Sequence, residues 1–152
     1  FSNYLVEVGG ELRARGVNTQ SKPWSIGIDK PTEKTSVQRE LEAIVELDNQ
    51  SMATSGNYRK FWVDPSNGLK YAHTIDPKTG RPAMNQLLSA TIIHPEAMIA
   101  DAYATACMVW GTAECIRFIG DQEAFAAFLI YVDEAGEWNT YQSDGLQITQ
   151  VD

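Results

Sequence analysis

Few side chains in this sequence are chemically reactive, and the most informative is a histidine directly before a turn. His73 is one of only two histidines among 152 residues, and it stands in the stretch YAHTIDPKTGRP, residues 71–82. Asp76 can accept bonds from the backbone that follows it, Pro77 presets its own φ, and Gly80 can adopt a left-handed conformation, so DPKTG predicts a turn. His73 would then end a strand beside a loop, where functional side chains are common. Taken alone, an ordinary half-exposed strand histidine is the simpler explanation.

A carboxylate and a hydroxyl one helical turn apart form a second candidate site. Asp101 and Thr105 lie in the alanine-rich segment 95–111, which we predict to be a helix, and residues four apart on a helix share a face. Mg²⁺ prefers oxygen ligands and keeps waters or substrate phosphates, so these two side chains could hold it if a pyrophosphate supplied further ligands. The ordinary alternative is an aspartate favoured by the helix dipole and a threonine bonded back to a carbonyl.

Two weaker signals concern phosphate or cofactor binding. The segment VGGELRARG offers Gly10 in a glycine pair and Arg15 on a strand, and such groups can approach a phosphate. It is neither a P-loop nor a GxGxxG motif, so a bulge or a tight strand crossing explains it as well. Ser55 and Gly56 belong to TSGN, residues 54–57, a small-residue corner that fits a ligand or a plain turn.

The elements that must position these residues are mostly short strands. We predict strands at 3–10, 12–16, 23–29, 41–63 (two or three of them) and 87–95, and a closing hairpin over 124–145 with DEAGE as its turn. The start of segment 41–63 could also be a short helix. One helix is predicted from Pro95 to Gly111, with His94 at its start, and a second ends at Gly120. The order predicts one α+β domain built on a mostly antiparallel sheet with two adjacent helices.

Composition limits the classes of function. With 43% apolar residues the chain can bury a core, and its net charge of −8 disfavours binding to nucleic acids or anionic membrane surfaces. No apolar run approaches the roughly 20 residues of a membrane span, and the N-terminus has no signal-peptide pattern. We therefore expect any targeting signal to lie outside this sequence.

The two cysteines are predicted to be free thiols. Cys107 and Cys115 both fall in the stretch that we predict to be helical, eight residues apart. At about 1.5 Å per residue their separation would be roughly 12 Å, which is too far for a disulfide. No spacing of cysteine and histidine suggests zinc, so buried apolar packing is expected for each.

Five segments, taken in order, closely resemble the ApbE family of FAD:protein FMN transferases, long called thiamine biosynthesis lipoproteins. They are VEVGGELRARG, WSIGID, SMATSGNYRKF, YAHTIDPKTGRP and MIADAYATACMVWG, and the resemblance runs to about Gly120. The histidine of the H-x-I-D-P turn and the D-x-x-x-T helix are active-site hallmarks of the family. The resemblance therefore favours the functional explanation of His73, Asp101 and Thr105, and it implies an ApbE-like (T-fold-like) α+β fold.

The resemblance implies an enzyme that binds FAD and, with Mg²⁺ at the pyrophosphate, moves FMN onto a threonine or serine of a target flavoprotein, releasing AMP. Asp101 and Thr105 would be Mg²⁺ ligands. His73 would lie at the reacting pyrophosphate and help activate the acceptor hydroxyl. Ile75 and Asp76 would line the flavin site. The weaker segments are assigned to cofactor binding through Gly10, Arg15, Ser55 and Gly56.

Members of the family are longer than this chain, and the resemblance assigns residues 1–152 to the C-terminal portion, with the N-terminal half absent. We expect this portion alone to be inactive, and to pair with a second copy through the face thereby left open. By resemblance, the full-length form would be a periplasmic, inner-membrane lipoprotein that modifies subunits of redox complexes. Hydrolysis of FAD to FMN and AMP, or non-catalytic flavin binding, are the alternatives.

Overall fold

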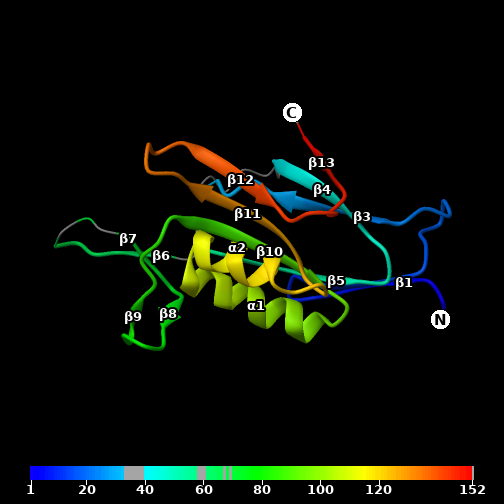
Figure 1. Cartoon of the computed structure of the whole chain (residues 1–152), viewed down its shortest axis with the longest axis horizontal. Coiled ribbons are helices and arrows are strands. Elements are labelled where there is room, and N and C mark those ends of the chain that lie inside the picture. The colour runs from blue at the N-terminus through cyan, green and yellow to red at the C-terminus, as the bar shows by residue number, and fades with distance from the viewer. Residues whose placement is uncertain (33–39, 58–60, 67, 69, 152) are drawn as a thin grey trace.

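A six-stranded antiparallel sheet forms the centre of the computed structural model, which describes residues 1–32, 40–57, 61–66, 68 and 70–151 (Figure 1). Its order is β1-β2-β5-β10-β11-β12, and all neighbours are antiparallel. The strands are β1 (Tyr4–Val8), β2 (Glu11–Arg15), β5 (Ser51–Gly56), β10 (Leu87–His94), β11 (Ala126–Val132) and β12 (Trp138–Gln142).

A smaller sheet and two short hairpins complete the strand structure. The small sheet has the order β13-β4-β3, from β3 (Trp24–Asp29), β4 (Leu41–Leu47) and β13 (Ile148–Gln150). The hairpins pair β6 (Phe61–Val63) with β7 (Lys70–Ala72), and β8 (Ile75–Asp76) with β9 (Arg81–Pro82). Figure 1 shows the small sheet on one face of the large sheet, the helices on the other, and both hairpins at one end.

The two helices follow directly on one another, as the sequence predicted. Helix α1 (Ala97–Trp110) and helix α2 (Thr112–Gly120) are separated only by Gly111, which is buried and has a φ of 82°. This φ favours glycine, so the residue breaks the helix. His94 stands at the start as expected, because its Nδ1 accepts a hydrogen bond from the Glu96 N–H at 3.0 Å. No helix in the described residues is long and apolar enough to cross a membrane.

The core lies in two layers because successive residues of a strand face opposite sides of the sheet. On β10, Ala90 and Ile92 pack in the cluster beneath the helices, whereas Ile93 packs in the cluster beneath the small sheet. The face of α1 that covers the sheet consists of small or flexible side chains: Ala100, Ala104, Cys107 and Met108. The expected α+β fold with a mostly antiparallel sheet and two adjacent helices is therefore confirmed.

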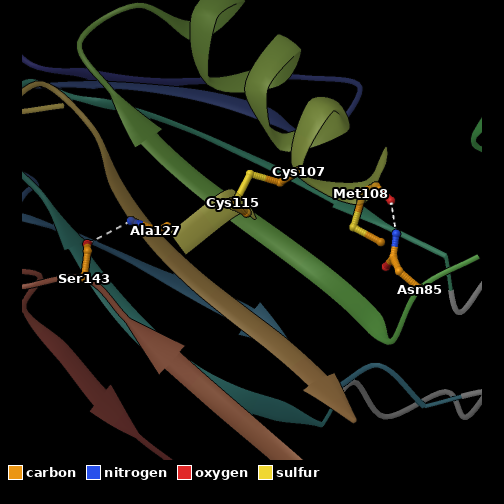
Figure 2. Close-up of a disulfide and its surroundings, with 6 residues drawn as sticks. All are labelled: Asn85, Cys107, Met108, Cys115, Ala127 and Ser143. Carbon is orange, nitrogen blue, oxygen red and sulfur yellow. Dashed lines mark hydrogen bonds between the residues drawn. A yellow bond between two sulfur atoms is a disulfide. The ribbon is translucent and has the colours of Figure 1, made fainter. Parts of the chain in front are cut away.

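Cys107 and Cys115 form a disulfide, so the prediction of free thiols was wrong (Figure 2). The two Cα atoms lie 5.1 Å apart, and both residues are fully buried. The distance estimate measured residues 107–115 along one continuous helix, although a helix end was predicted at Gly111 between them. Because Gly111 ends α1 and turns the chain, α2 packs against α1 and places the second cysteine beside the first.

The strand pairing settles the start of segment 41–63, and it shows that the corner predicted for residues 54–57 was wrong for all but Asn57. Segment 41–63 begins with strand β4 and not with a helix, and residues 54–56 of the predicted TSGN corner extend β5, with Ser55 paired to Ala90 of β10. The chain bends only at Asn57, and residues 58–60 of the segment lie outside the described part. The closing hairpin has the predicted DEAGE turn, in which the Asp133 N–H donates to the Glu137 carbonyl at 2.9 Å.

Candidate active site

A direct contact between two hydroxyl groups connects two of the predicted site segments. Ser55 Oγ on β5 lies 3.1 Å from Thr105 Oγ1 on α1. Ser55 faces the helices because Ala53, two residues earlier on the same strand, packs in the cluster beneath them. The alanines of that cluster let α1 lie close to β5, so a short serine side chain can reach the helix.

Asp101 stands one helical turn before Thr105 on the same exposed face of α1. Both residues are exposed, whereas Ala100 and Ala104 beside them are buried against the sheet. The described residues contain no group of three or more histidine, cysteine, aspartate or glutamate side chains that could hold a metal. A cation here would therefore bind one carboxylate and hydroxyl oxygens. That donor set fits Mg²⁺ when waters or phosphates complete the shell.

His73 lies between the two short hairpins, as expected of a residue at a strand end. It follows the last residue of β7, is exposed, and precedes Thr74, whose Oγ1 donates to Asn57 Oδ1 at 2.9 Å. Asn57 comes directly after β5, and its N–H donates to the Leu88 carbonyl at 3.1 Å. The histidine segment is thus joined to the end of the strand that carries Ser55.

The predicted DPKTG turn is confirmed, and Asp76 organises it. Its Oδ1 accepts from the Lys78 N–H at 2.9 Å, its Oδ2 accepts from Thr79 Oγ1 at 3.2 Å, and its carbonyl accepts from the Gly80 N–H at 2.8 Å. Gly80 has a φ of 67°, the left-handed conformation that the prediction required. Both carboxylate oxygens of Asp76 therefore serve its own turn. Ile75 beside it is 49% exposed, and its assignment to the flavin site stays a prediction.

Arg15 is not brought to the Ser55 contact, whereas the register of Leu12 with Met52, continued along both strands, brings Gly10 opposite Thr54, next to Ser55. Gly9 and Gly10 form the exposed two-residue turn between β1 and β2, with φ values of 69° and 111°. Arg13 of β2 pairs with Ser51, from which β5 runs away in the opposite direction. At about 3.3 Å per residue, Arg15 lies roughly 20 Å from Ser55 along the sheet. Gly56, by contrast, adjoins Ser55 and pairs with Ser89.

Sequence reasoning missed three polar residues that hold these segments together. Thr74 and Asn57 lie inside the quoted motifs, next to His73 and Gly56, but nothing local indicates that they bond to each other. Asn85 donates from Nδ2 to the Met108 carbonyl at 2.9 Å, near the end of α1 (Figure 2). A polar residue beside a catalytic candidate is the signal that could have drawn attention to the first two.

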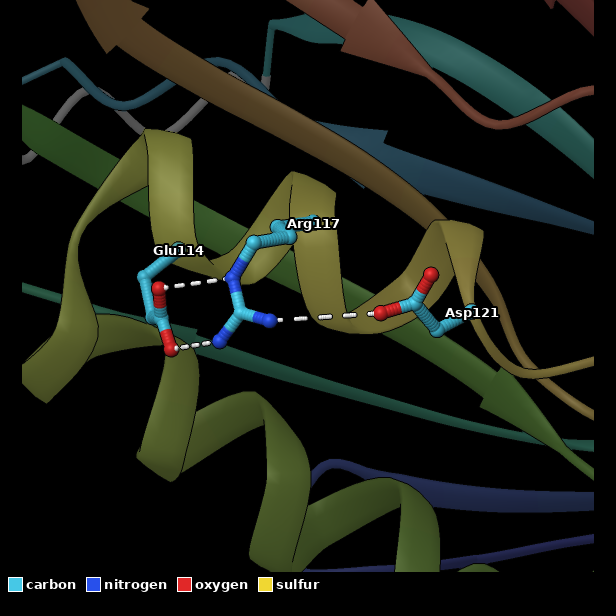
Figure 3. A network of polar contacts seen from close by, with 3 residues as sticks. All are labelled: Glu114, Arg117 and Asp121. Carbon is cyan, nitrogen blue, oxygen red and sulfur yellow. Dashed lines mark hydrogen bonds and ion pairs between the residues drawn. The ribbon is translucent and has the colours of Figure 1, made fainter.

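Glu114 and Arg117, two residues with shifted pKa values, lie on helix α2, away from the Ser55–Thr105 contact. Arg117 donates to both carboxylate oxygens of Glu114 and lies 4.0 Å from Asp121 (Figure 3). The hydrogen bond from Arg117 lowers the pKa of Glu114 below its ordinary value, and the same bond raises the pKa of Arg117. All three groups are exposed, so we assign them no part in the chemistry.

Comparison with known proteins finds a family match and several relatives of the chain. Residues 1–129 match the ApbE family. The chain is 42% identical over 134 residues to an FAD:protein FMN transferase of Haemophilus influenzae and 38% identical over 143 residues to that of Escherichia coli. These alignments cover 88% and 94% of the chain but only 37% and 39% of the relatives, so the chain spans well under half of their length.

Solved structures agree with the sequence comparison. The flavin transferase ApbE from Vibrio cholerae superposes with a TM-score of 0.75 at 34% identity, over 94% of this chain and 43% of that one. The apo form of the Pseudomonas stutzeri flavinyl transferase ApbE gives a TM-score of 0.73 at 34% identity, over 94% and 42%. On the family match and on these relatives, the chain belongs to the ApbE family.

Proposed function

We propose that this chain is the part of an FAD:protein FMN transferase that carries the proton-handling histidine and the metal ligands. The curated relatives carry that name, although the chain spans less than 40% of their length. The observation that supports it most is the contact of Ser55 with Thr105, next to the strand end to which the His73 segment is bonded. Three separately predicted segments meet there at one end of the sheet.

The proposed reaction exchanges one phosphorus–oxygen bond for another. The acceptor hydroxyl oxygen bonds to the phosphorus of the FMN half of FAD, and the bond from that phosphorus to the AMP half breaks, with its electron pair leaving on AMP. His73 takes the proton of the acceptor hydroxyl as general base. Asp101 and Thr105 would hold Mg²⁺, which would supply charge neutralisation at the pyrophosphate. Ser55 orients the Thr105 hydroxyl.

Replacing His73 tests this proposal. In the intact protein, His73→Ala should lower the single-turnover rate of FMN transfer by about 100-fold or more, because general-base catalysis is lost, while FAD affinity changes only a few-fold. Single-turnover transfer and FAD titration on the same variant measure both quantities. Lost affinity with an unchanged rate at saturating FAD would make His73 a binding residue and refute its catalytic role.

Hydrolysis of FAD to FMN and AMP is the second candidate function. Because His73 is exposed, a water molecule could take the place of the acceptor hydroxyl. Product analysis with and without an acceptor protein separates the two: AMP release that does not depend on the acceptor, with no flavin attached to protein, indicates hydrolysis. Flavin binding without any AMP release would indicate a non-catalytic flavin-binding module.

We also propose that the protein works outside the cytoplasm, in the periplasm, as a membrane-anchored lipoprotein. The Cys107–Cys115 disulfide supports the compartment, because disulfides form and persist in oxidising compartments, whereas the membrane anchor rests on the family resemblance. Fractionation of cells, followed by thiol labelling under denaturing conditions, tests this. The proposal fails if the protein is found in the cytoplasm with both thiols free.

The proposed partners are FAD, an acceptor flavoprotein and a second copy of the chain. Pairing of two copies is supported by β1, an edge strand of the large sheet whose Val6 and Val8 are exposed. Sedimentation of the protein of residues 1–152 at micromolar concentration should show a dimer. A monomer there would refute pairing.

A further inference from the structure

The segment that carries His73 leaves the large sheet after β5 and returns to it at β10. After hairpin β6/β7, only His73 and Thr74 precede hairpin β8/β9. The hydrogen bonds that Asp76 accepts from Lys78 and Thr79 make the second hairpin internally stiff, so it can change its orientation as one unit unless a contact holds it. Besides the interaction that His73 makes itself, its place depends on what holds its neighbour Thr74.

Thr74 is bonded in two directions. Its Oγ1 donates to Asn57 Oδ1 at 2.9 Å in a partly buried contact, and its carbonyl accepts from the Ala83 N–H at 2.8 Å. Ala83, just after β9, is only 8% exposed. The Asn57 N–H in turn donates to the Leu88 carbonyl of β10. Thr74 thus joins the stiff hairpin on one side to β5 and β10 on the other.

The same path leads to the hydroxyl contact of the candidate active site. Asn57 lies two residues beyond Ser55, whose Oγ is 3.1 Å from Thr105 Oγ1. From His73 to Thr105 the path consists of Thr74, one hydrogen bond, the end of β5, and a second hydrogen bond. The return of the segment is anchored separately, because Asn85 donates to the Met108 carbonyl of α1. Of the two hydrogen bonds on this path, the Thr74–Asn57 bond is the nearer to His73.

We propose that Thr74 and Asn57 are positioning residues whose hydrogen bond places the His73 imidazole relative to Ser55 and Thr105. The catalytic consequence rests on the proposed function, whereas the placement is a property of the protein alone. A displacement of about 1 Å can cost about 100-fold in rate. We therefore expect loss of the bond to lower the rate of FMN transfer at saturating FAD by about 10- to 100-fold, with a change of KM for FAD of only a few-fold.

The experiment compares matched variants of the intact protein. Thr74→Val removes the hydroxyl at nearly constant shape, and Asn57→Leu removes the acceptor. Thr74→Ser keeps the hydroxyl and should behave like the wild type. Thr149→Val, on the distant strand β13, is the control for loss of an exposed threonine hydroxyl. If the bond is what matters, the double variant Thr74→Val/Asn57→Leu should lose no more rate than either single variant.

A second readout does not depend on activity. The NMR signals of the His73 imidazole should shift or broaden in Thr74→Val and in Asn57→Leu, while those of His94 stay unchanged and serve as an internal reference. Unchanged His73 signals in both variants would overturn the proposal, and so would shifted signals with a wild-type transfer rate. If the wild type transfers no FMN but the signals still shift, the placement by Thr74 and Asn57 is supported and the proposed function fails.

Discussion

The helix-covered part of the large sheet and the hairpin segment 61–82 are held together by different forces. Beneath the helices, side chains from three strands and both helices form one buried cluster, closed by the Cys107–Cys115 disulfide. Between residues 61 and 82, none of the described side chains is buried, and order comes from hydrogen bonds such as those of Asp76 and Thr74 and from the stacked rings of Trp62 and Tyr71. The proposed metal ligands therefore stand on a packed frame, whereas the histidine stands on a segment whose described side chains are not buried.

This difference predicts which measurement each substitution changes. Substitutions within the packed frame should lower the free energy of unfolding, because apolar burial and the disulfide contribute to it. Substitutions in the hairpin segment should alter the position of His73 with little effect on global unfolding. Substitutions of exposed residues on the frame should change the rate of FMN transfer if the residue contacts the substrate or the metal. Otherwise they should change neither the rate nor the free energy of unfolding.

The largest expected effect is on chemistry. Asp101→Ala in the intact protein should abolish detectable FMN transfer, because it removes the proposed charged ligand of Mg²⁺, while thermal unfolding stays near wild type because Asp101 is exposed. Thr105→Ala should be milder because a neutral hydroxyl contributes less, and Thr105→Ser is the matched control. Transfer assays across a Mg²⁺ titration measure this. Equal activity of Asp101→Ala and wild type at limiting Mg²⁺ would refute the assignment.

The second expected effect is on the stability of the frame. Reduction of the Cys107–Cys115 disulfide should lower the free energy of unfolding by about 2–3 kcal/mol, because the bond closes a loop of roughly eight residues. Denaturant unfolding with and without a reductant measures the difference. The double variant Cys107→Ala/Cys115→Ala should be insensitive to the reductant. A wild type that is equally stable in both conditions would contradict a structural role for the bond.

A smaller effect is expected in the hairpin segment. Asp76→Ala removes the acceptors for Lys78 and Thr79, so His73 should be held less firmly and FMN transfer should fall by about 10-fold. The midpoint of global unfolding should hardly change. Asp76→Asn, which keeps the Oδ1 acceptor, should retain more activity than Asp76→Ala. If Asp76→Ala lowered FAD affinity and not the rate, Asp76 would be a binding residue, as first assigned from the family resemblance.

The smallest effect concerns the ion pairs of α2. Because the hydrogen bond from Arg117 lowers the pKa of Glu114, this pair stabilises the fold above the ordinary carboxyl pKa of 4.5, and the contribution is lost as the pH falls through the lowered value. Both side chains are exposed, so Glu114→Gln should leave the unfolding midpoint at pH 7 unchanged within error. A clear destabilisation at pH 7 that disappears at low pH would show that the pair matters more than its exposure indicates.

Local signals in the sequence determined the elements and several of their boundaries. Gly111 ends the first helix and Gly80 completes the DPKTG turn because both occupy left-handed backbone conformations that favour glycine. Asp76 could be predicted to organise that turn, since its acceptors reach only the next few residues. His73 and the Asp101/Thr105 pair were selected as candidates by residue type and spacing, with support from the family resemblance.

The tertiary structure decided which candidates meet. The Ser55–Thr105 contact, the Thr74–Asn57 bond and the Cys107–Cys115 disulfide each depend on how an element packs against its neighbours. A continuous helix over eight residues would keep the thiols of Cys107 and Cys115 apart, but the helix break at Gly111 brings them into contact. In the same way, the antiparallel register of β2 with β5 carries Arg15 away from Ser55. Spacing along the chain describes one element at a time, and distances between elements follow only from packing.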